Sequence, residues 1–244
     1  MKWLKIKTRE WIQNYKTFAL RRQHRKAKKL CESLMQNLEL FHAIEGAKTS
    51  ARFEKEFLSE VPSFKSRQAL FDKCLKAIKN PGLYLEFGTY KGDSINLLAK
   101  LAPAQTFYGF DSFAGLPETW TVDSKKGNFD LQGKLPLVWD NVRLIKGWYN
   151  ESLPNFIKQH PNAKVAFIHM DCDLYSSTKT VLDLLRSMLS QGTIICFDEY
   201  YNYSEWEAGE HKAFIEFTKQ HHIQFEYLGY IRMGRQVAVK IKSI

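Results

Sequence analysis

The sequence has few cysteines, and they form no recognisable pattern. Four occur in 244 residues, scattered as Cys31, Cys74, Cys172 and Cys196. There is no CxxC pair and no spacing of the kind that binds zinc, which argues against a zinc module or a disulfide framework. Scattered, unpaired cysteines fit a reducing compartment, so we expect a cytoplasmic protein.

Long hydrophobic runs, repeats and low-complexity tracts are also missing. The longest apolar runs, at 164–170 and 193–197, are far shorter than the roughly 20 residues of a membrane-spanning helix and look like buried strands. Charged residues interrupt the N-terminus, which does not resemble a secretory signal. With 44% hydrophobic and 25% charged residues, the composition is that of a globular protein.

The net charge of +10 is concentrated at one end of the chain. Residues 1–30 contain eleven Lys or Arg and a single acid, Glu10, whereas the remaining residues carry 25 basic and 25 acidic side chains. The high isoelectric point therefore describes an N-terminal arm and not the rest of the protein. Net charge gives the main domain no support for nucleic-acid binding, and we expect no nucleic-acid partner.

Residues 1–30 are predicted to form a basic amphipathic arm. Trp3, Trp11, Tyr15 and Phe18 recur among Lys and Arg at roughly helical spacing, which is typical of a helix at a membrane interface. Three interpretations remain open. The arm binds an anionic membrane surface, at the inner face of the membrane, or an acidic partner or glycan polymer, or it packs a homo-oligomer.

The rest of the chain divides into a helical extension, residues 31–80, and an α/β domain, residues 81–244. Strands are predicted at 83–87, 106–110, 142–145, 165–170 and 193–197, with helices between several of them and a final hairpin at 224–228 and 236–241. This alternation predicts a Rossmann-like α/β fold, with a mostly parallel sheet and a C-terminal antiparallel hairpin. Ligands in such sheets bind outside the carboxyl ends of the strands.

Two of these strand ends have the features of a nucleoside site. Gly88 allows a tight turn after the first strand, and Gly92 allows close approach at the start of a helix, although the GxGxxG fingerprint is missing. Asp111 follows the second strand about twenty residues later, where a carboxylate meets ribose hydroxyls. We therefore predict that Asp111 binds a ribose.

Carboxylates cluster after two further strands. Asp171 and Asp173 follow the fourth strand, and Asp198 and Glu199 follow the fifth. Neighbouring strand ends bring these groups into one pocket, where their mutual repulsion favours a bound cation. Oxygen ligands suit Mg²⁺, Mn²⁺ or Ca²⁺ better than zinc.

Four segments resemble the macrocin O-methyltransferase (TylF/MycF-type) family of class I S-adenosylmethionine-dependent methyltransferases. They are LEFGTYKGDS at 85–94, YGFDSFAGLPETW at 108–120, HMDCDLYSSTKTVLDLL at 169–185 and GTIICFDEY at 192–200. The resemblance implies a class I methyltransferase sheet, an S-adenosylmethionine cofactor and a hydroxyl acceptor, specifically a sugar of a natural product. It also assigns residues: Glu86, Gly88 and Ser94 to the methionine part, Asp111 to the ribose, Gly147 and Trp148 to the adenine, and Asp171, Asp198 and Glu199 to Mg²⁺.

The general base is less well defined by this resemblance. Related catechol-type enzymes have a lysine three positions after the first metal aspartate, where this chain has Leu174. Asp173 and His211 are our candidate bases. The long segment 116–140, with Trp120, Phe129 and Trp139, is predicted to cover the acceptor as a lid.

Two other functions are compatible with parts of the pattern. One is an NAD-dependent or other nucleotide-dependent enzyme on a similar sheet, against which the missing GxGxxG and the carboxylate cluster argue. The other is a noncatalytic, membrane-associated protein that retains the fold, against which the intact acidic residues argue. Fold alone does not decide between them.

Overall fold

A computed structural model describes residues 20–121 and 123–244 of the chain. The chain divides into two compact units, Met1–Glu45 and Gly46–Ile244, which we describe separately. In the first unit a helix covers residues 20–35, and helix α2 (Leu38–Phe53) begins after Asn37. The Asn37 Oδ1 accepts a hydrogen bond of 3.0 Å from the Leu40 amide and so caps α2. No helix in the described ranges is long and apolar enough to span a bilayer.

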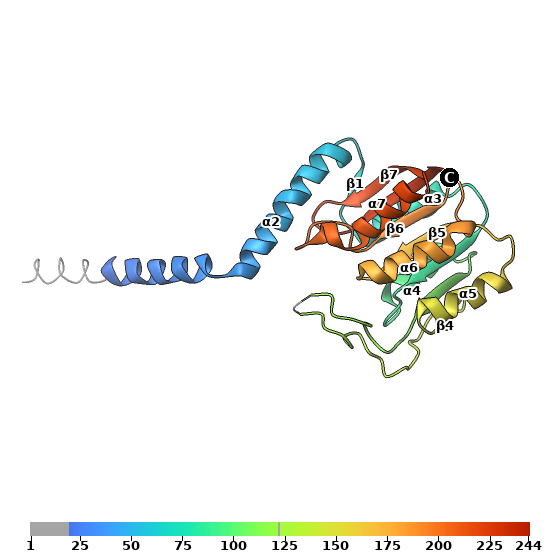
Figure 1. The fold of residues 1–244 in the computed structure, drawn as a ribbon, viewed down its shortest axis with the longest axis horizontal. Coiled ribbons are helices and arrows are strands. Elements are labelled where there is room, and N and C mark those ends of the chain that lie inside the picture. Colours follow the sequence, from blue (N-terminus) through green and yellow to red (C-terminus); the bar gives the residue numbers. More distant parts are fainter. Residues whose placement is uncertain (1–19, 122) are drawn as a thin grey trace, which may run out of the picture. The chain divides into compact units, whose positions relative to one another are not determined.

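The second unit is built on a twisted sheet, in which the described residues form eight strands in the order β1-β7-β8-β6-β5-β2-β3-β4 (Figure 1). Strand β8 runs antiparallel to both β6 and β7, and the remaining pairs are parallel. The strands are β1 (Ser63–Phe64), β2 (Leu83–Phe87), β3 (Phe107–Asp111), β4 (Val142–Lys146), β5 (Val165–Met170), β6 (Ile194–Phe197), β7 (Gln224–Ile231) and β8 (Val237–Ser243).

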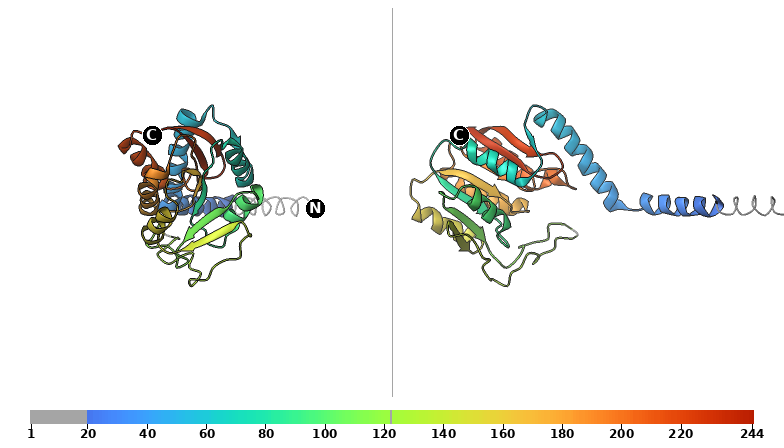
Figure 2. Two further views of the ribbon diagram at one scale, coloured as in Figure 1. Left: turned by 90° about the vertical axis from the view of Figure 1, so that its right-hand side faces the viewer. Right: turned by 180° about the vertical axis from the view of Figure 1, so that it is seen from behind.

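Helices cover both faces of this sheet and bury two apolar clusters (Figures 1 and 2). On one face Phe71 and Leu98 pack against β-strand residues such as Phe167, and on the other Leu182 and Phe214 pack against residues such as Phe197. The helices of the first face are α3 (Arg67–Ala77) and α4 (Asp93–Leu101), and those of the second are α5 (Tyr149–Gln159), α6 (Tyr175–Leu185) and α7 (Glu210–Gln220).

The predicted fold class is confirmed, including the mostly parallel sheet and the antiparallel C-terminal hairpin. Two elements were not predicted. Helix α5 contains Pro154, which interrupts a helical pattern in the sequence, and β1 is only two residues long. The predicted segment boundaries at 30/31 and 80/81 stay predictions.

Residues before the predicted α/β domain contribute directly to this unit. Strand β1 pairs with β7, and Leu70, Phe71 and Cys74 of α3 are fully buried in the core. Helix α3 begins after Ser66, whose Oγ accepts a hydrogen bond from the Ala69 amide. Its first residue, Arg67, is thereby fixed beside the carboxyl ends of the central strands, where it becomes part of the site described next.

Candidate active site

A cavity of about 660 Å³ lies at the carboxyl ends of strands β2 to β6. This is the edge at which open α/β sheets bind ligands. Glu86, Gly92 and His211, three of the residues predicted from the sequence, do not line it. The predicted residues that do are Gly88, Ser94, Asp111, Gly147, Trp148, Asp171, Asp173, Asp198 and Glu199.

The turn after β2 lies directly against the loop after β5. Gly88 has a φ of +93°, and a Cβ atom at this position would overlap the carbonyl oxygen of Asp171. The Asp171 amide donates a hydrogen bond of 2.9 Å to the Phe87 carbonyl, and this bond also holds the loop after β5 against the end of β2. Only glycine combines this conformation with this approach, so the glycine brings the backbone of the predicted cofactor loop to the acidic cluster.

Asp111 is held in one orientation on the cavity wall. Its Oδ2 accepts a hydrogen bond of 2.7 Å from the Tyr90 amide, and its Oδ1 accepts one of 2.7 Å from the Phe113 amide. Each carboxylate oxygen keeps a further lone pair. The side chain is therefore fixed in advance and can still accept hydrogen bonds from two neighbouring hydroxyls.

Gly147 and Trp148 form the wall after β4. The Gly147 amide donates to the Asp111 carbonyl (3.0 Å), which connects this turn to the end of β3. Trp148 is the residue before α5 and has 38% of its surface exposed. The structure brings both residues to the same cavity as Asp111, and their predicted place beside an adenine stays a prediction.

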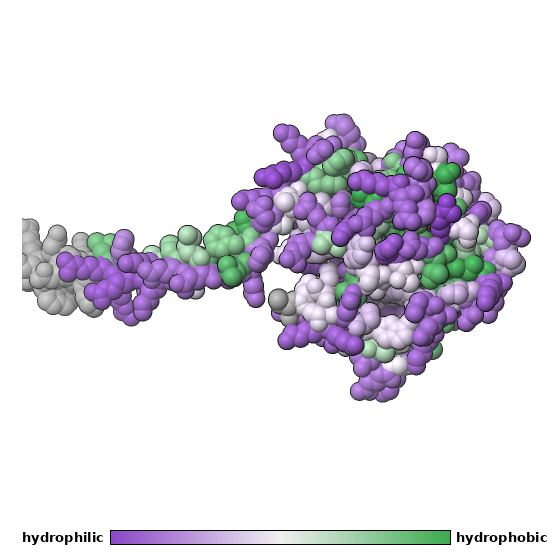
Figure 3. All heavy atoms as spheres, viewed as in Figure 1, coloured by the Kyte–Doolittle hydropathy of each residue, from purple (hydrophilic) through white to green (hydrophobic). Residues whose placement is uncertain are grey.

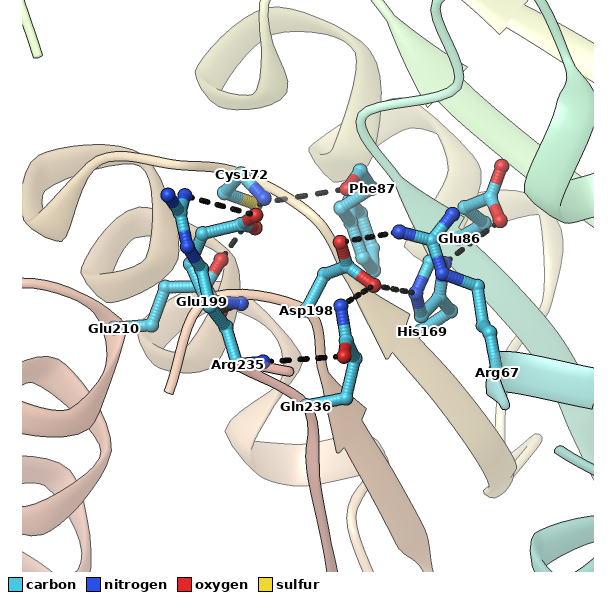
Figure 4. A network of polar contacts seen from close by, with 10 residues as sticks. All are labelled: Arg67, Glu86, Phe87, His169, Cys172, Asp198, Glu199, Glu210, Arg235 and Gln236. Atoms are coloured by element: carbon cyan, nitrogen blue, oxygen red, sulfur yellow. Dashed lines mark hydrogen bonds and ion pairs between the residues drawn. The ribbon is translucent and has the colours of Figure 1, made fainter. Parts of the chain in front are cut away.

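Glu86 lies beneath the cavity and not on its surface. Its side chain is fully buried, and its Oε2 is 2.8 Å from the Nδ1 of His169, which is also fully buried (Figure 4). The two residues stand opposite each other in the β2–β5 register. Burial raises the pKa of Glu86, and the hydrogen bond and charge of His169 oppose this. Gly92, the residue that precedes α4, does not line the cavity either.

Four carboxylates converge on the other side of the cavity. Oxygens of Asp171, Asp173 and Glu199 lie within 4.8 Å of one another, and Asp171 also groups with Asp198 and a ring nitrogen of His169. The Oε2 of Glu199 is buried and has no hydrogen-bond partner. A buried, unpaired carboxylate oxygen beside two other carboxylates is the donor set expected for a hard divalent cation.

Asp198 differs from the other three because both of its oxygens have partners. Arg67 donates from Nη2 to Oδ2 at 2.6 Å, and Gln236 donates from Nε2 to Oδ1 at 3.2 Å (Figure 4). The Nε2 of His169 is 3.5 Å from the same Oδ1. Burial would raise the pKa of Asp198, but His169 and then Arg67 stabilise the carboxylate and lower it.

The remaining carboxylates of the cluster favour protonation when no cation is bound. Burial, followed by the charge of Asp198, raises the pKa of Asp171 well above its usual range and that of Asp173 to about 7. Burial and the charge of Asp171 also raise the pKa of Glu199 well above its usual range. A cation would remove this penalty by compensating the charges.

Several residues of this network were not identified from the sequence. Glu210, at the start of α7, accepts from the amides of Cys172 (3.0 Å) and Glu199 (3.2 Å) and so joins the loops after β5 and β6. Its pKa is raised to about 8, chiefly by burial. His169 had a usable signal, since an ionisable residue inside an apolar strand requires a buried partner. Arg67 and Gln236 had none, because only the tertiary fold brings them to Asp198.

His211 lies outside the cavity, among aromatic rings. Its ring centroid is 4.8 Å from that of Trp206, 4.9 Å from that of Tyr200 and 5.6 Å from that of Phe53. Burial, followed by the charge of Lys219, lowers its pKa to about 4. This position does not fit the predicted role of a base, because the ring packs in the core and does not face the acceptor.

Comparison with known proteins identifies the family. The sequence profile described as macrocin-O-methyltransferase (TylF) matches residues 64–229, which is more than half of the chain. The chain belongs to this family. This is the family that the four segments quoted above predicted.

Two curated relatives of this family come from Streptomyces. The chain is 30% identical to 8-demethyl-8-(2,3-dimethoxy-alpha-L-rhamnosyl)-tetracenomycin-C 4'-O-methyltransferase of Streptomyces olivaceus, over 49% of this chain and 53% of the relative. It is 27% identical to demethyldecarbamoylnovobiocin O-methyltransferase of Streptomyces niveus, over the same shares. The chain thus spans about half the length of the curated relatives it matches.

The solved structures support the fold. The crystal structure of the calicheamicin methyltransferase CalS11 superimposes with a TM-score of 0.57 at 24% identity, covering 71% of this chain and 77% of that one. At this identity the likeness concerns the architecture alone. The match to the family profile, and not the shared architecture, argues against the alternative of an NAD-dependent enzyme.

The segment between β3 and β4 forms a further wall of the cavity in this TylF-family chain. Trp120 and Phe129 line the cavity, whereas Trp139 does not. The guanidinium of Arg235, from the β7–β8 turn, lies 5.9 Å from the ring centroid of Trp120 and 5.1 Å from that of Tyr203. Arg235 therefore links this segment to the residues that follow β6.

Proposed function

We propose that this chain transfers the methyl group of S-adenosylmethionine to a hydroxyl of a sugar on a small molecule, with help from a divalent cation. Family membership and the printed activities of its curated relatives, one a rhamnosyl-tetracenomycin methyltransferase, support the reaction class and the sugar. The observation that carries the proposal is a single cavity with Asp111 and the glycine turn on one side and the carboxylates on the other.

The proposed cofactor site lies on the side of the cavity where hydrogen bonds already hold Asp111 in place. Asp111 would accept hydrogen bonds from the ribose hydroxyls, and Gly147 and Trp148 would flank the adenine. Gly88 and Ser94 would border the methionine part. The buried position of Glu86 supports a different role from the one its sequence position implied: it stabilises the end of β2 through His169. Bound there, S-adenosylmethionine supplies an electrophilic methyl group.

We propose Asp171, Glu199 and, as the family resemblance implies, Asp198 as the cation ligands. Asp173, whose oxygen lies within 4.8 Å of those of Asp171 and Glu199, is the alternative third ligand. Held by these residues, a divalent cation would supply Lewis-acid chemistry that lowers the pKa of an acceptor hydroxyl. Asp198 would ligate through the lone pairs that Arg67 and Gln236 leave free on its two oxygens. Asp173, which lines the cavity beside Asp171, is the proposed base that takes the hydroxyl proton. The aromatic wall of Trp120 and Phe129 would exclude water from the acceptor.

The reaction is tested by following S-adenosylhomocysteine formation with a panel of glycosides that have free sugar hydroxyls. We expect turnover that requires both an acceptor and Mg²⁺ and is lost in EDTA. Turnover that survives EDTA would contradict the cation, and no turnover with any acceptor would favour a noncatalytic protein. Lys158→Gln, an exposed change on α5, is the matched control with unchanged turnover.

The division of roles among the carboxylates is tested by Mn²⁺ titration of two variants. Asp198→Asn should weaken Mn²⁺ binding. Asp173→Asn should leave Mn²⁺ binding nearly unchanged and reduce turnover by roughly 100-fold or more, the usual contribution of a general base. If Asp173→Asn weakens Mn²⁺ binding and Asp198→Asn does not, Asp173 is the ligand instead.

A further inference from the structure

The first unit contains a surface that the methyltransferase family does not explain. The family match begins at residue 64, whereas the described part of the N-terminal arm and the start of α2 lie at residues 20–45. Residues 1–19 of the predicted arm lie outside the described residues. The surface consists of the helix at residues 20–35 and the first residues of α2.

The helix at residues 20–35 separates charge from apolar side chains around its circumference. At 3.6 residues per turn, all six of its Lys and Arg residues fall within an arc of about 160°. Its apolar residues fall within the opposite arc of about 140°, which also contains Gln23 and His24. The basic residues are Arg21, Arg22, Arg25, Lys26, Lys28 and Lys29, and the apolar ones are Leu20, Ala27, Leu30, Cys31, Leu34 and Met35.

The apolar arc is exposed in this unit. Leu20, Leu30, Leu34 and Met35 have 65%, 60%, 44% and 72% of their surface accessible. Leu38, Phe41 and Ile44, at three-residue spacing in α2, are exposed as well. Figure 3 shows apolar residues along one side of this segment and hydrophilic residues along the other. A contiguous exposed apolar stripe indicates an interaction surface.

The charge on this helix distinguishes between candidate partners. A second copy of the helix would bring together two segments that each have six basic residues and one acid, Glu32, within residues 20–35. Those charges repel one another. An anionic bilayer instead attracts them, while its acyl region accepts the apolar arc. We propose that residues 20–45 dock this protein on an anionic lipid surface, with the apolar arc inserted and the basic arc against the headgroups.

Flotation of the full chain with vesicles tests the proposal. We expect binding to phosphatidylglycerol–phosphatidylcholine vesicles that weakens with salt, and much weaker binding to phosphatidylcholine alone. Each basic residue near such a surface contributes roughly a fivefold factor, so the triple variant Arg21→Gln/Arg22→Gln/Arg25→Gln should bind about 100-fold more weakly. Equal binding to both vesicle types would overturn the electrostatic basis.

Two further variants separate the surface from general effects of charge. Lys79→Gln/Lys100→Gln/Lys158→Gln removes the same charge from exposed positions of the second unit and should retain binding. Leu30→Ser/Leu34→Ser should weaken binding at every salt concentration, because it removes the inserted side chains. If the wild-type chain does not float and is instead a dimer that this variant dissociates, a second copy covers the stripe and the proposal is wrong.

Discussion

At the scale of residues, the pair Glu86–His169 shows how the site depends on buried charge. Each residue lies in an otherwise apolar strand, and each is fully buried. Burial opposes a charged His169, but its contacts with Asp198 and Glu86 prevail and raise its pKa well above the usual value. His169 therefore lies between two acidic side chains, Glu86 beneath the cofactor side and Asp198 in the acidic cluster.

Removing one member of this pair should be costly. Glu86→Gln leaves a buried imidazolium with one carboxylate fewer, and we expect the free energy of unfolding to fall by about 3 kcal/mol. Urea denaturation monitored by tryptophan fluorescence measures this change. Glu86→Leu combined with His169→Leu removes both charges and should recover part of the loss. A cost below about 1 kcal/mol for Glu86→Gln would show that the pair is not ionised.

His211 should make stability depend on pH. Its pKa is lowered from 6.5 to about 4 in the folded protein, so the unfolded chain binds more protons between these values. Neutral His211 therefore contributes about 3 kcal/mol to the free energy of unfolding. This contribution is complete above pH 6.5 and is lost as the pH falls toward 4. His211→Phe keeps the aromatic packing and should flatten this part of the stability profile. The free energy of unfolding, measured by urea denaturation, is compared at each pH for the wild type and His211→Phe. The same pH dependence in both proteins would contradict the burial of a neutral ring.

The sequence predicts single residues well where backbone position alone decides. Gly88 and Asp111 were chosen because they end strands that are readable from hydrophobic runs, whereas the family resemblance assigned Gly147 and Trp148. All four line the cavity. The family resemblance assigned Glu86 to the methionine part of the cofactor. Its side chain is fully buried and does not line the cavity, because it pairs with His169 between the strands. Arg67 and Gln236 reach Asp198 from 131 and 38 residues away, which no local pattern encodes.

At the scale of elements, the segment between β3 and β4 is the best candidate for a moving part. It contributes Trp120 and Phe129 to the cavity, and its exposed Lys125 and Lys126 are trypsin sites. As a lid it would close over bound ligands. We expect cleavage after these lysines to slow when S-adenosylmethionine and an acceptor are added, as followed by mass spectrometry.

Cleavage in the N-terminal arm provides the internal control for that experiment. Arg21, Arg22 and Arg25 are exposed in the described helix and belong to the other compact unit. Their cleavage rate should not respond to the ligands. If protection appears in the arm and not at Lys125 and Lys126, the β3–β4 segment is not the lid.

Elements were predictable where length and pattern agree. The buried parallel strands are continuous apolar runs between turn signals, and each was predicted to within a few residues. Helix α5 was missed because Pro154 interrupts its pattern, although the residue fits within the helix. Strand β1 was missed because a pair of residues has no periodicity and exists only through its contact with β7.

At the scale of the whole molecule, the two proposed functions belong to separate parts of the chain. The residues beyond 30 are formally neutral and contain the cavity, whereas the first 30 carry the net charge of +10. This separation allows the arm to be changed without touching the carboxylates. The proposed methyl transfer and the proposed lipid docking can therefore be tested separately, and the failure of one does not contradict the other.

The most direct test of the central claim is calorimetric titration of the purified protein with S-adenosylmethionine and, separately, with NAD, each in Mg²⁺ and in EDTA. We expect micromolar binding of S-adenosylmethionine and none of NAD. We also expect Asp111→Asn to abolish most of this affinity, because the side chain would no longer accept hydrogen bonds from both ribose hydroxyls. Binding of NAD alone, or of neither ligand, would contradict the proposed methyltransferase.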